Sequence, residues 1–156
     1  MNNTYRTTLV FVLVLVVSAF LYAFQEQTIK KKDVPQPVIS SFEKAYPHAR
    51  AKGFSKETEE GKVIYEIESV EGTTKRDVTF DAEGNIVSVE EAINRHDLPE
   101  AVNATLQKEY PKGKLLICER VTEGNATLYE VLLKTGKEKF EIVLSPDGKI
   151  TKREKK

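Results

Sequence analysis

The chain has 156 residues, of which 40% are hydrophobic and 31% are charged, and its basic and acidic residues balance to a formal net charge of zero. A balanced charge disfavours a general nucleic-acid binder, because such proteins carry a basic stripe or patch. The single cysteine, Cys118, excludes an intrachain disulfide and a multi-cysteine metal site, and two histidines are too few for most zinc centres.

Residues 1–24 are predicted to be a signal peptide or an N-terminal membrane anchor. Leu9–Phe24 is apolar except for Ser18 and follows a short polar start. This order is typical of a secretory signal peptide, with cleavage expected after Ala19 and with Ala23 as the alternative site. An uncleaved anchor is the alternative, because these 16 positions come close to the roughly 20 that span a bilayer. Either interpretation predicts a periplasmic or secreted chain, anchored to the inner membrane if uncleaved, with residues 25–32 as a mobile linker.

A tandem repeat organises the remainder of the sequence. The stretch Asp33–Pro47 (DVPQPVISSFEKAYP) returns 64 residues later as Asp97–Pro111 (DLPEAVNATLQKEYP). An ungapped repeat of this length predicts two copies of one folding unit, residues 33–96 and residues 97–156. Because each copy is near the lower size limit for an independent core, we expect the two copies to share one core.

Each copy is predicted to begin with a helix. Asp33 and Asp97 stand three residues before Gln36 and Glu100, which is the spacing of a capping box. The proline that follows each apolar stripe is expected to end the helix. Apolar residues recur at every fourth position, which predicts one buried helical face: Val34, Val38, Phe42 and Tyr46, then Leu98, Val102, Leu106 and Tyr110.

Four strands are expected after each helix, because apolar residues alternate along runs that are bounded by glycine-containing turns. Gly84 and Gly148 fall at turn positions that need a left-handed backbone. The predicted fold class is α+β: two tandem α-β-β-β-β units whose helices pack on one face of an antiparallel sheet. The predicted strands are Arg50–Lys56, Lys62–Val70, Lys75–Phe80 and Ile86–Glu91, then Lys114–Val121, Ala126–Lys134, Lys139–Leu144 and Ile150–Glu154.

The sheet face that the helices leave uncovered is the candidate contact surface. On the second strand of each copy it carries Glu66 and Glu68, then Glu130 and Leu132. A solvated sheet face is one interpretation of these polar positions, and a partner-binding surface is the other.

No set of residues predicts catalysis, a cofactor or a metal site. Cys118 is equivalent to Phe54 of the other copy, which favours a core position over a nucleophile. His48 is equivalent to Lys112 and His96 lies between the copies, so exposed loop positions are expected. Neighbouring carboxylates on an open sheet do not form the cleft that glycoside hydrolysis needs. We therefore expect a protein that is not an enzyme.

Four short motifs recur in both copies: Val34-Pro35, Tyr46-Pro47, Tyr65-Glu66-Ile67 and Phe80-Asp81-Ala82-Glu83-Gly84, then Leu98-Pro99, Tyr110-Pro111, Tyr129-Glu130-Val131 and Leu144-Ser145-Pro146-Asp147-Gly148. Their order resembles a known family, the PepSY-like proteins, whose tandem units are similar to the beta-lactamase-inhibitory-protein fold. One departure is Ser145-Pro146 at the position of Asp81-Ala82, and another is the absence of tryptophan. The resemblance implies an exported bacterial protein that binds or inhibits other proteins, and it supplies no catalytic residues.

Two functions remain open at this point. The first is an exported, non-enzymatic protein-binding module that inhibits or modulates an envelope or extracellular hydrolase or peptidase. The second is a peptide-binding, glycan-binding or structural module of the cell envelope. The expected partner is another exported protein or peptide and not nucleic acid, with membrane contact only through residues 1–24 if they stay attached.

Overall fold

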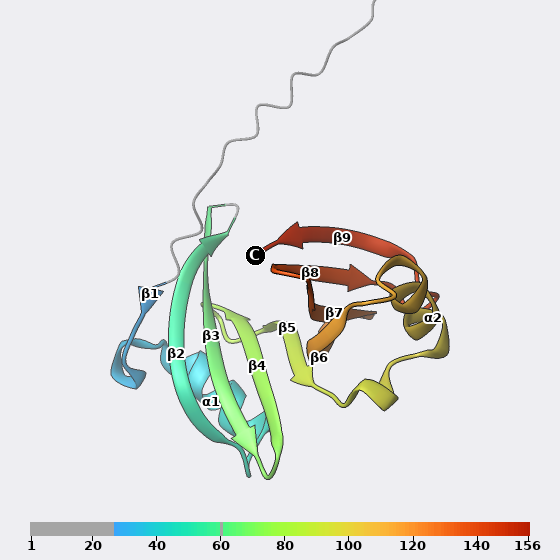
Figure 1. Cartoon of the computed structure of the whole chain (residues 1–156). Coiled ribbons are helices and arrows are strands. Elements are labelled where there is room, and N and C mark those ends of the chain that lie inside the picture. The colour runs from blue at the N-terminus through green and yellow to red at the C-terminus, as the bar shows by residue number, and fades with distance from the viewer. Residues whose placement is uncertain (1–26, 60) are drawn as a thin grey trace, which may run out of the picture.

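The computed structural model describes residues 27–59 and 61–156, so the predicted signal peptide or anchor lies outside it. No helix in these ranges is long and apolar enough to cross a membrane. The described ranges contain two α-helices and nine strands (Figure 1). In chain order they are β1 (Gln27–Thr28), α1 (Gln36–Ala45), β2 (Arg50–Glu59), β3 (Lys62–Glu71), β4 (Thr74–Asp81), β5 (Ile86–Ala92), α2 (Glu100–Glu109), β6 (Lys114–Glu123), β7 (Ala126–Thr135), β8 (Glu138–Leu144) and β9 (Ile150–Lys155).

The strands form one antiparallel sheet in which each strand pairs with the next along the chain, from β1 at one edge to β9 at the other. Val89 of β5 packs against the core under α1, and it faces Thr122 of β6. Cys118, four residues before Thr122, belongs to the core under α2. Because residues an even number apart share a sheet face, α1 and α2 lie on the same side. The antiparallel α+β class is as predicted, and no helix in the described ranges covers the opposite face.

The same order of elements occurs twice along this sheet. The helix α1 and the strands β2 to β5 each have a counterpart that begins 64 residues later, in α2 and β6 to β9. Two positions 64 residues apart are called equivalent below. The ends of β2 to β9 agree with the predicted runs to within three residues, because the alternation and the turn glycines determine these strands locally.

The starts of both helices differ from the prediction. No side chain caps α1 or α2, so the capping role expected for Asp33 and Asp97 is wrong. Val34 and Leu98 each precede a proline and are extended, with ψ of 135° and 139°, which separates the acidic residues from the helix. Asp97 instead closes a short 3-10 turn, where it accepts a hydrogen bond from the backbone N–H of Asn94 at 3.2 Å.

The turns after β4 and β8 pack directly against the first turn of each helix. Gly84 and Gly148 have φ of 86° and 83°, which confirms the predicted left-handed backbone. A Cβ added to them would lie 2.6 Å from the carbonyl oxygen of Pro37 and 2.5 Å from that of Ala101. Glycine is therefore needed at both positions for its backbone conformation and for its lack of a side chain.

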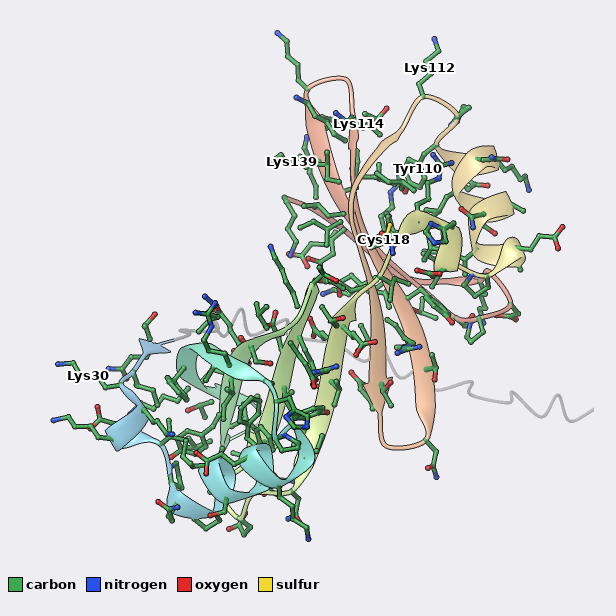
Figure 2. The ribbon with its side chains drawn as sticks, turned by 90° about the horizontal axis from the view of Figure 1, so that it is seen from below. Lys30, Tyr110, Lys112, Lys114, Cys118 and Lys139 are labelled. Carbon is green, nitrogen blue, oxygen red and sulfur yellow. The ribbon has the colours of Figure 1, made fainter. Side chains whose placement is uncertain are left out.

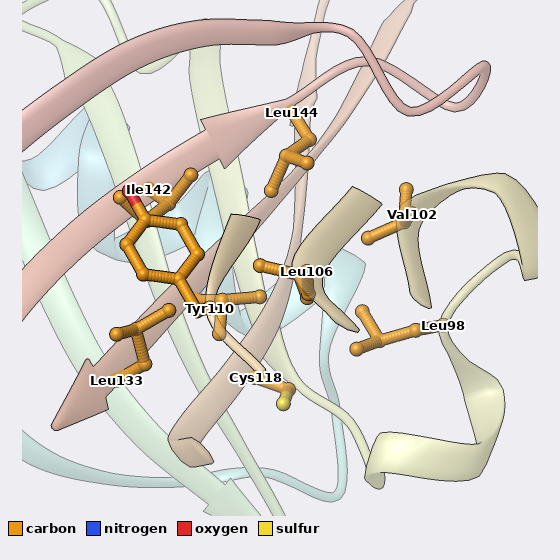
Figure 3. Packing of buried hydrophobic residues seen from close by; sticks show 9 residues of the cluster. Leu98, Val102, Leu106, Tyr110, Cys118, Leu133, Ile142 and Leu144 are labelled. Carbon is orange, nitrogen blue, oxygen red and sulfur yellow. The ribbon is translucent and has the colours of Figure 1, made fainter. Parts of the chain in front are cut away.

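Two separate hydrophobic cores lie between the sheet and the helices, so the expectation of one shared core is wrong. Charged residues stand on the helix-covered face where β5 meets β6: Glu91 accepts hydrogen bonds from Arg76 at 2.7 Å and from Arg120 at 2.6 Å. This ion network takes the place of apolar contacts between the cores. The first core contains Val34, Val38, Ile39, Phe42, Ile67, Val78 and Phe80. The second core (Figure 3) contains Leu98, Val102, Leu106, Tyr110, Cys118, Val131, Leu133, Ile142 and Leu144.

The segment expected to be a linker is ordered over its described part. Gln27 and Thr28 form β1, which pairs with Lys56 and Ser55 of β2. The backbone N–H of Ile29 then donates to the carbonyl oxygen of Phe54 at 2.9 Å. A strand of two residues is too short to show a periodic pattern, which is why sequence reasoning missed it.

Candidate functional site

The four predicted contact positions lie on the sheet face opposite the helices. Glu66 and Glu68 flank a fully buried core residue of β3, and Glu130 and Leu132 flank its equivalent in β7. Successive side chains of a strand point to opposite faces, so all four belong to the uncovered face. They do not form one cluster, because β4, β5 and β6 lie between β3 and β7.

A carboxylate from each of six successive strands lies on this uncovered face. In the sheet register, Glu68 faces Asp77, Asp77 faces Glu90, and Glu119 faces Glu130. Glu119 also faces Ala92, two residues from Glu90, so Glu90 and Glu119 are diagonal neighbours across β5 and β6. The register therefore joins both halves of the sheet in a single row, which we call the acidic band: Glu68, Asp77, Glu90, Glu119, Glu130 and Glu141.

Partial burial and mutual repulsion disfavour ionisation in the middle of the acidic band. Burial, followed by the charges of Glu141 and Glu90, raises the pKa of Glu130 to about 7. Burial also raises the pKa of Asp77, Glu90 and Glu119, with neighbouring acidic groups as the next cause in each case. Because an opposite charge nearby favours the ionised form, a cation on this face would lower these pKa values.

Among the described residues, lysine ion pairs are confined to one end of the acidic band. Glu141 lies 3.4 Å from Lys152 Nζ and 2.7 Å from Lys156 Nζ. The equivalent of Glu141 is Asp77, but the positions equivalent to the two lysines hold a serine and an alanine. Within residues 27–59 and 61–156, no lysine or arginine makes an ion pair with the four middle carboxylates, Asp77, Glu90, Glu119 and Glu130.

Sequence reasoning identified Glu68 and Glu130 and missed the other four members of the acidic band. Each missed residue is a single polar position in an alternating strand, which looks like any solvated position. One available signal was the equivalence of Asp77 and Glu141, since both copies keep an acid there. The diagonal contact between Glu90 and Glu119 joins the two copies and follows only from the pairing of β5 with β6.

The groups that could support other chemistry are dispersed. Cys118 is buried, and burial raises the pKa of its thiol, which confirms the predicted core position. His48 and His96 are exposed, and His96 Nε2 lies 3.5 Å from Asp97 Oδ1. In the part of the chain that the structure describes, no three His, Cys, Asp or Glu side chains are placed to hold a metal ion. The uncovered face can attract cations.

The architecture defines an α+β protein with two helices on one face of an antiparallel sheet and an uncovered acidic face. A family model described as "Putative beta-lactamase-inhibitor-like, PepSY-like" matches the sequence twice, over residues 23–86 and 64–152. The chain belongs to this PepSY-like family. Among curated proteins, none matches the sequence.

Solved structures of Bacteroides proteins share the fold. A protein of Bacteroides eggerthii described as a "putative periplasmic" protein has 17% identity and a TM-score of 0.67, over 78% of this chain and 88% of that chain. A DUF2874 family protein of Bacteroides uniformis has 21% identity and a TM-score of 0.65, with coverage of 78% and 88%. A BLIP-like protein of Bacteroides fragilis has 23% identity and a TM-score of 0.62, with coverage of 78% and 86%.

Proposed function

We propose that this chain is an exported, non-enzymatic protein-binding module whose acidic band binds a basic segment of another exported protein. The observation that carries the proposal is that the four middle carboxylates make no ion pair within the described residues and have raised pKa values. A lysine or arginine of a partner would form charge-assisted hydrogen bonds there and would relieve the repulsion between the carboxylates.

The acidic band is long enough to bind an extended peptide segment. Strands of a sheet lie about 4.8 Å apart, so six strands place the ends of the band roughly 24 Å apart along the sheet. An extended chain advances about 3.3 Å per residue, so a segment of about seven residues would follow the whole band. The partner segment is therefore proposed to be extended and to carry several basic side chains.

The partner is proposed to be a hydrolase or peptidase of the envelope or the extracellular space, which the chain inhibits or modulates. The description of the family as beta-lactamase-inhibitor-like supports an inhibitory role. The description of the Bacteroides eggerthii protein as periplasmic supports export. The burial of the Cys118 thiol and the exposure of both histidines support a non-enzymatic role.

Affinity capture from an envelope extract tests this proposal. Three forms of the chain serve as bait: the unaltered chain, a band variant with Glu90→Gln, Glu119→Gln and Glu130→Gln, and a control variant with Glu83→Gln, Glu100→Gln and Glu109→Gln. Both variants lose three negative charges, but the control positions lie in the turn after β4 and on α2. A partner with a basic surface should be retained by the unaltered chain and the control and lost by the band variant.

The salt dependence of capture provides a second readout, because ionic contacts at an open surface weaken as salt rises. A partner that all three baits retain equally, or whose retention does not change with salt, would show that the acidic band is not the binding surface.

A further inference from the structure

Three lysines lie directly opposite one another at one end of the second half of the sheet. Lys114 of β6 faces Lys134 of β7, and Lys134 faces Lys139 of β8. Lys134 lies two residues beyond Leu132, so these side chains belong to the uncovered face. Side chains that are directly opposite on antiparallel strands have Cβ atoms about 4.5–5.5 Å apart, and like charges in such pairs are destabilising. We call these three residues the lysine row.

The lysine row has no acidic counterpart among the described residues. None of its members makes an ion pair within residues 27–59 and 61–156. The backbone N–H of Lys156 donates to the carbonyl oxygen of Lys139 at 3.0 Å, but the Lys156 ammonium lies 2.7 Å from Glu141. Glu138 likewise pairs with Lys155. The repulsion within the row is therefore uncompensated in the free chain, and an external anion would relieve it.

Two turns add further cations at the same end. Lys112 lies in the turn between α2 and β6, and Lys137 lies in the turn between β7 and β8. Both are exposed, as are all members of the lysine row. Figure 2 shows Lys112, Lys114 and Lys139 at one end of the second half of the sheet, whereas Lys30 lies on the first half. This end therefore presents a group of exposed lysines.

Exposed aliphatic side chains adjoin the lysine row. Leu116 and Ile117 are 40% and 44% exposed, although both are large hydrophobic residues. Ile117 faces Leu132, which is two residues from Lys134, so it lies on the uncovered face beside the row. Leu116 is the extra residue where the register of β6 against β7 shifts, and such a bulge redirects a side chain. This end of the sheet thus combines cations with exposed apolar surface.

The first half of the sheet does not repeat this combination. Val70 occupies the position equivalent to Lys134, so the row is interrupted there. The positions equivalent to Leu116 and Ile117 hold Lys52 and Gly53, neither of which has an apolar side chain. The repeated fold therefore does not itself require the lysine row or the exposed aliphatic residues.

We infer that the basic tip, formed by the lysine row with Lys112, Lys137, Leu116 and Ile117, docks on an anionic lipid bilayer. Lysines near an anionic bilayer are attracted to its headgroups, and exposed aliphatic side chains enter the boundary between headgroups and acyl chains. Protein interfaces are depleted in lysine, and paired contacts to a phosphate favour arginine, but every cation of the tip is a lysine.

This contact is distinct from the membrane contact expected of residues 1–24, and it goes beyond the proposed protein-binding function. The same lipids would repel the acidic band, so the chain would contact the bilayer by one end of its sheet. The middle of the uncovered face then stays open to a protein partner.

Sedimentation with lipid vesicles tests the inference. Residues 25–156 are used, because they include every described helix and strand and lack the apolar residues that precede them. The chain should bind vesicles that contain phosphatidylglycerol, an anionic lipid, and should bind pure phosphatidylcholine vesicles at least about tenfold more weakly. Binding should weaken as salt rises.

Two variants with the same loss of charge locate the contact. A row variant lacks the lysine row, and a control lacks three exposed lysines of the first half that make no ion pair within the described ranges. The row variant should bind about a hundredfold more weakly, because each lysine near an anionic surface contributes about a factor of five. The control should lose less than about threefold, because distant charges are screened. The substitutions are Lys114→Gln, Lys134→Gln and Lys139→Gln in the row variant, and Lys30→Gln, Lys32→Gln and Lys44→Gln in the control.

Leu116→Thr combined with Ile117→Thr tests the apolar contribution. It should weaken binding about tenfold, because binding at a bilayer scales with the apolar area buried. Val63→Thr combined with Val87→Thr, at positions that are 43% and 42% exposed, should leave binding unchanged. All substituted side chains are exposed, so the variants keep both cores.

Three results would overturn the inference: no preference for phosphatidylglycerol, equal losses in the row variant and its control, or unaltered binding in Leu116→Thr with Ile117→Thr. The last result, together with binding of the chain to inorganic polyphosphate, would make the basic tip a site for soluble polyanions. Because the vesicles contain no protein partner, such a failure leaves the proposed protein-binding function unaffected.

Discussion

Glu130 is a partly buried carboxylate on the uncovered face, and its pKa is raised to about 7. It stands in the middle of β7, with Glu119 opposite it on β6 and the charges of Glu141 and Glu90 nearby. Lys152 and Lys156 act in the opposite direction on its pKa, but burial and the acidic neighbours prevail. A side chain held in this way is only partly ionised at neutral pH, so it can respond both to pH and to a cationic partner.

The raised pKa of Glu130 predicts a pH dependence of stability. The pKa is about 7 in the folded chain against 4.5 for an unperturbed glutamate, so the folded chain binds more protons between these pH values. The free energy of unfolding should therefore fall as pH rises from about 4.5 to 7. Glu130→Gln should reduce this fall by on the order of 1 kcal/mol, which allows for the partial exposure of the side chain.

Urea unfolding of the chain and of Glu130→Gln at pH 5 and pH 7.5 measures the difference. Glu83→Gln, in the turn after β4, is the matched control and should leave the fall with pH unchanged. If the free energy of unfolding falls equally in Glu130→Gln and in the unaltered chain, Glu130 is not a source of the pH dependence.

At the scale of the elements, the helices are positioned by the turns beneath them more than by caps of their own. Neither α1 nor α2 has a side-chain cap, yet a glycine turn contacts the first turn of each helix. On the second helix, Thr105 Oγ1 also donates to the carbonyl oxygen of Gly148 at 2.8 Å. The contact between turn and helix is therefore a tertiary substitute for capping.

Alanine substitutions at two turn glycines, Gly72 and Gly84, should distinguish the free-energy cost of crowding this contact from the cost of backbone strain. Gly72 has φ of 61° and open space around it, so Gly72→Ala should cost only the left-handed backbone, roughly 1–2 kcal/mol. Gly84→Ala adds a methyl group 2.6 Å from the carbonyl oxygen of Pro37, so it should cost clearly more. Urea unfolding of both variants measures this, and equal losses would show that the turn can move away from α1.

At the scale of the whole molecule, one continuous sheet carries two independent cores. The strands pair without interruption from β1 to β9, but the cores are separated by the ion network of Glu91, Arg76 and Arg120. Backbone hydrogen bonds between β5 and β6 then provide the main continuity between the two halves. The halves are expected to open as separate cooperative units.

Hydrogen exchange after a core truncation tests this independence. Ile142→Ala in the second core should lower stability by about 2–5 kcal/mol and accelerate exchange in β6 to β9 while β2 to β4 stay protected. Val78→Ala, at the equivalent position of the first core, should give the reverse pattern. Faster exchange throughout the sheet in either variant would show that the two halves unfold together.

Local signals made most of the fold predictable. The alternation of apolar residues in the strands, the apolar stripe on each helix and the turn glycines are patterns within a few residues. They can therefore be recognised without knowledge of the tertiary contacts. The caps expected at Asp33 and Asp97 failed for a local reason, because the residue before each proline is extended and separates the acidic residue from the helix. The expected shared core and the missed strand β1 concern contacts between distant parts of the chain, which the sequence does not reveal.

The sequence by itself determined the repeating order of helix and strands and the uncovered sheet face, because periodicity and turn chemistry are local. Only the tertiary structure decided that six carboxylates form one row and that the two halves have separate cores. The physical reason is that register, burial and charge compensation depend on side chains brought together from different strands. The acidic band is therefore a property of the folded chain.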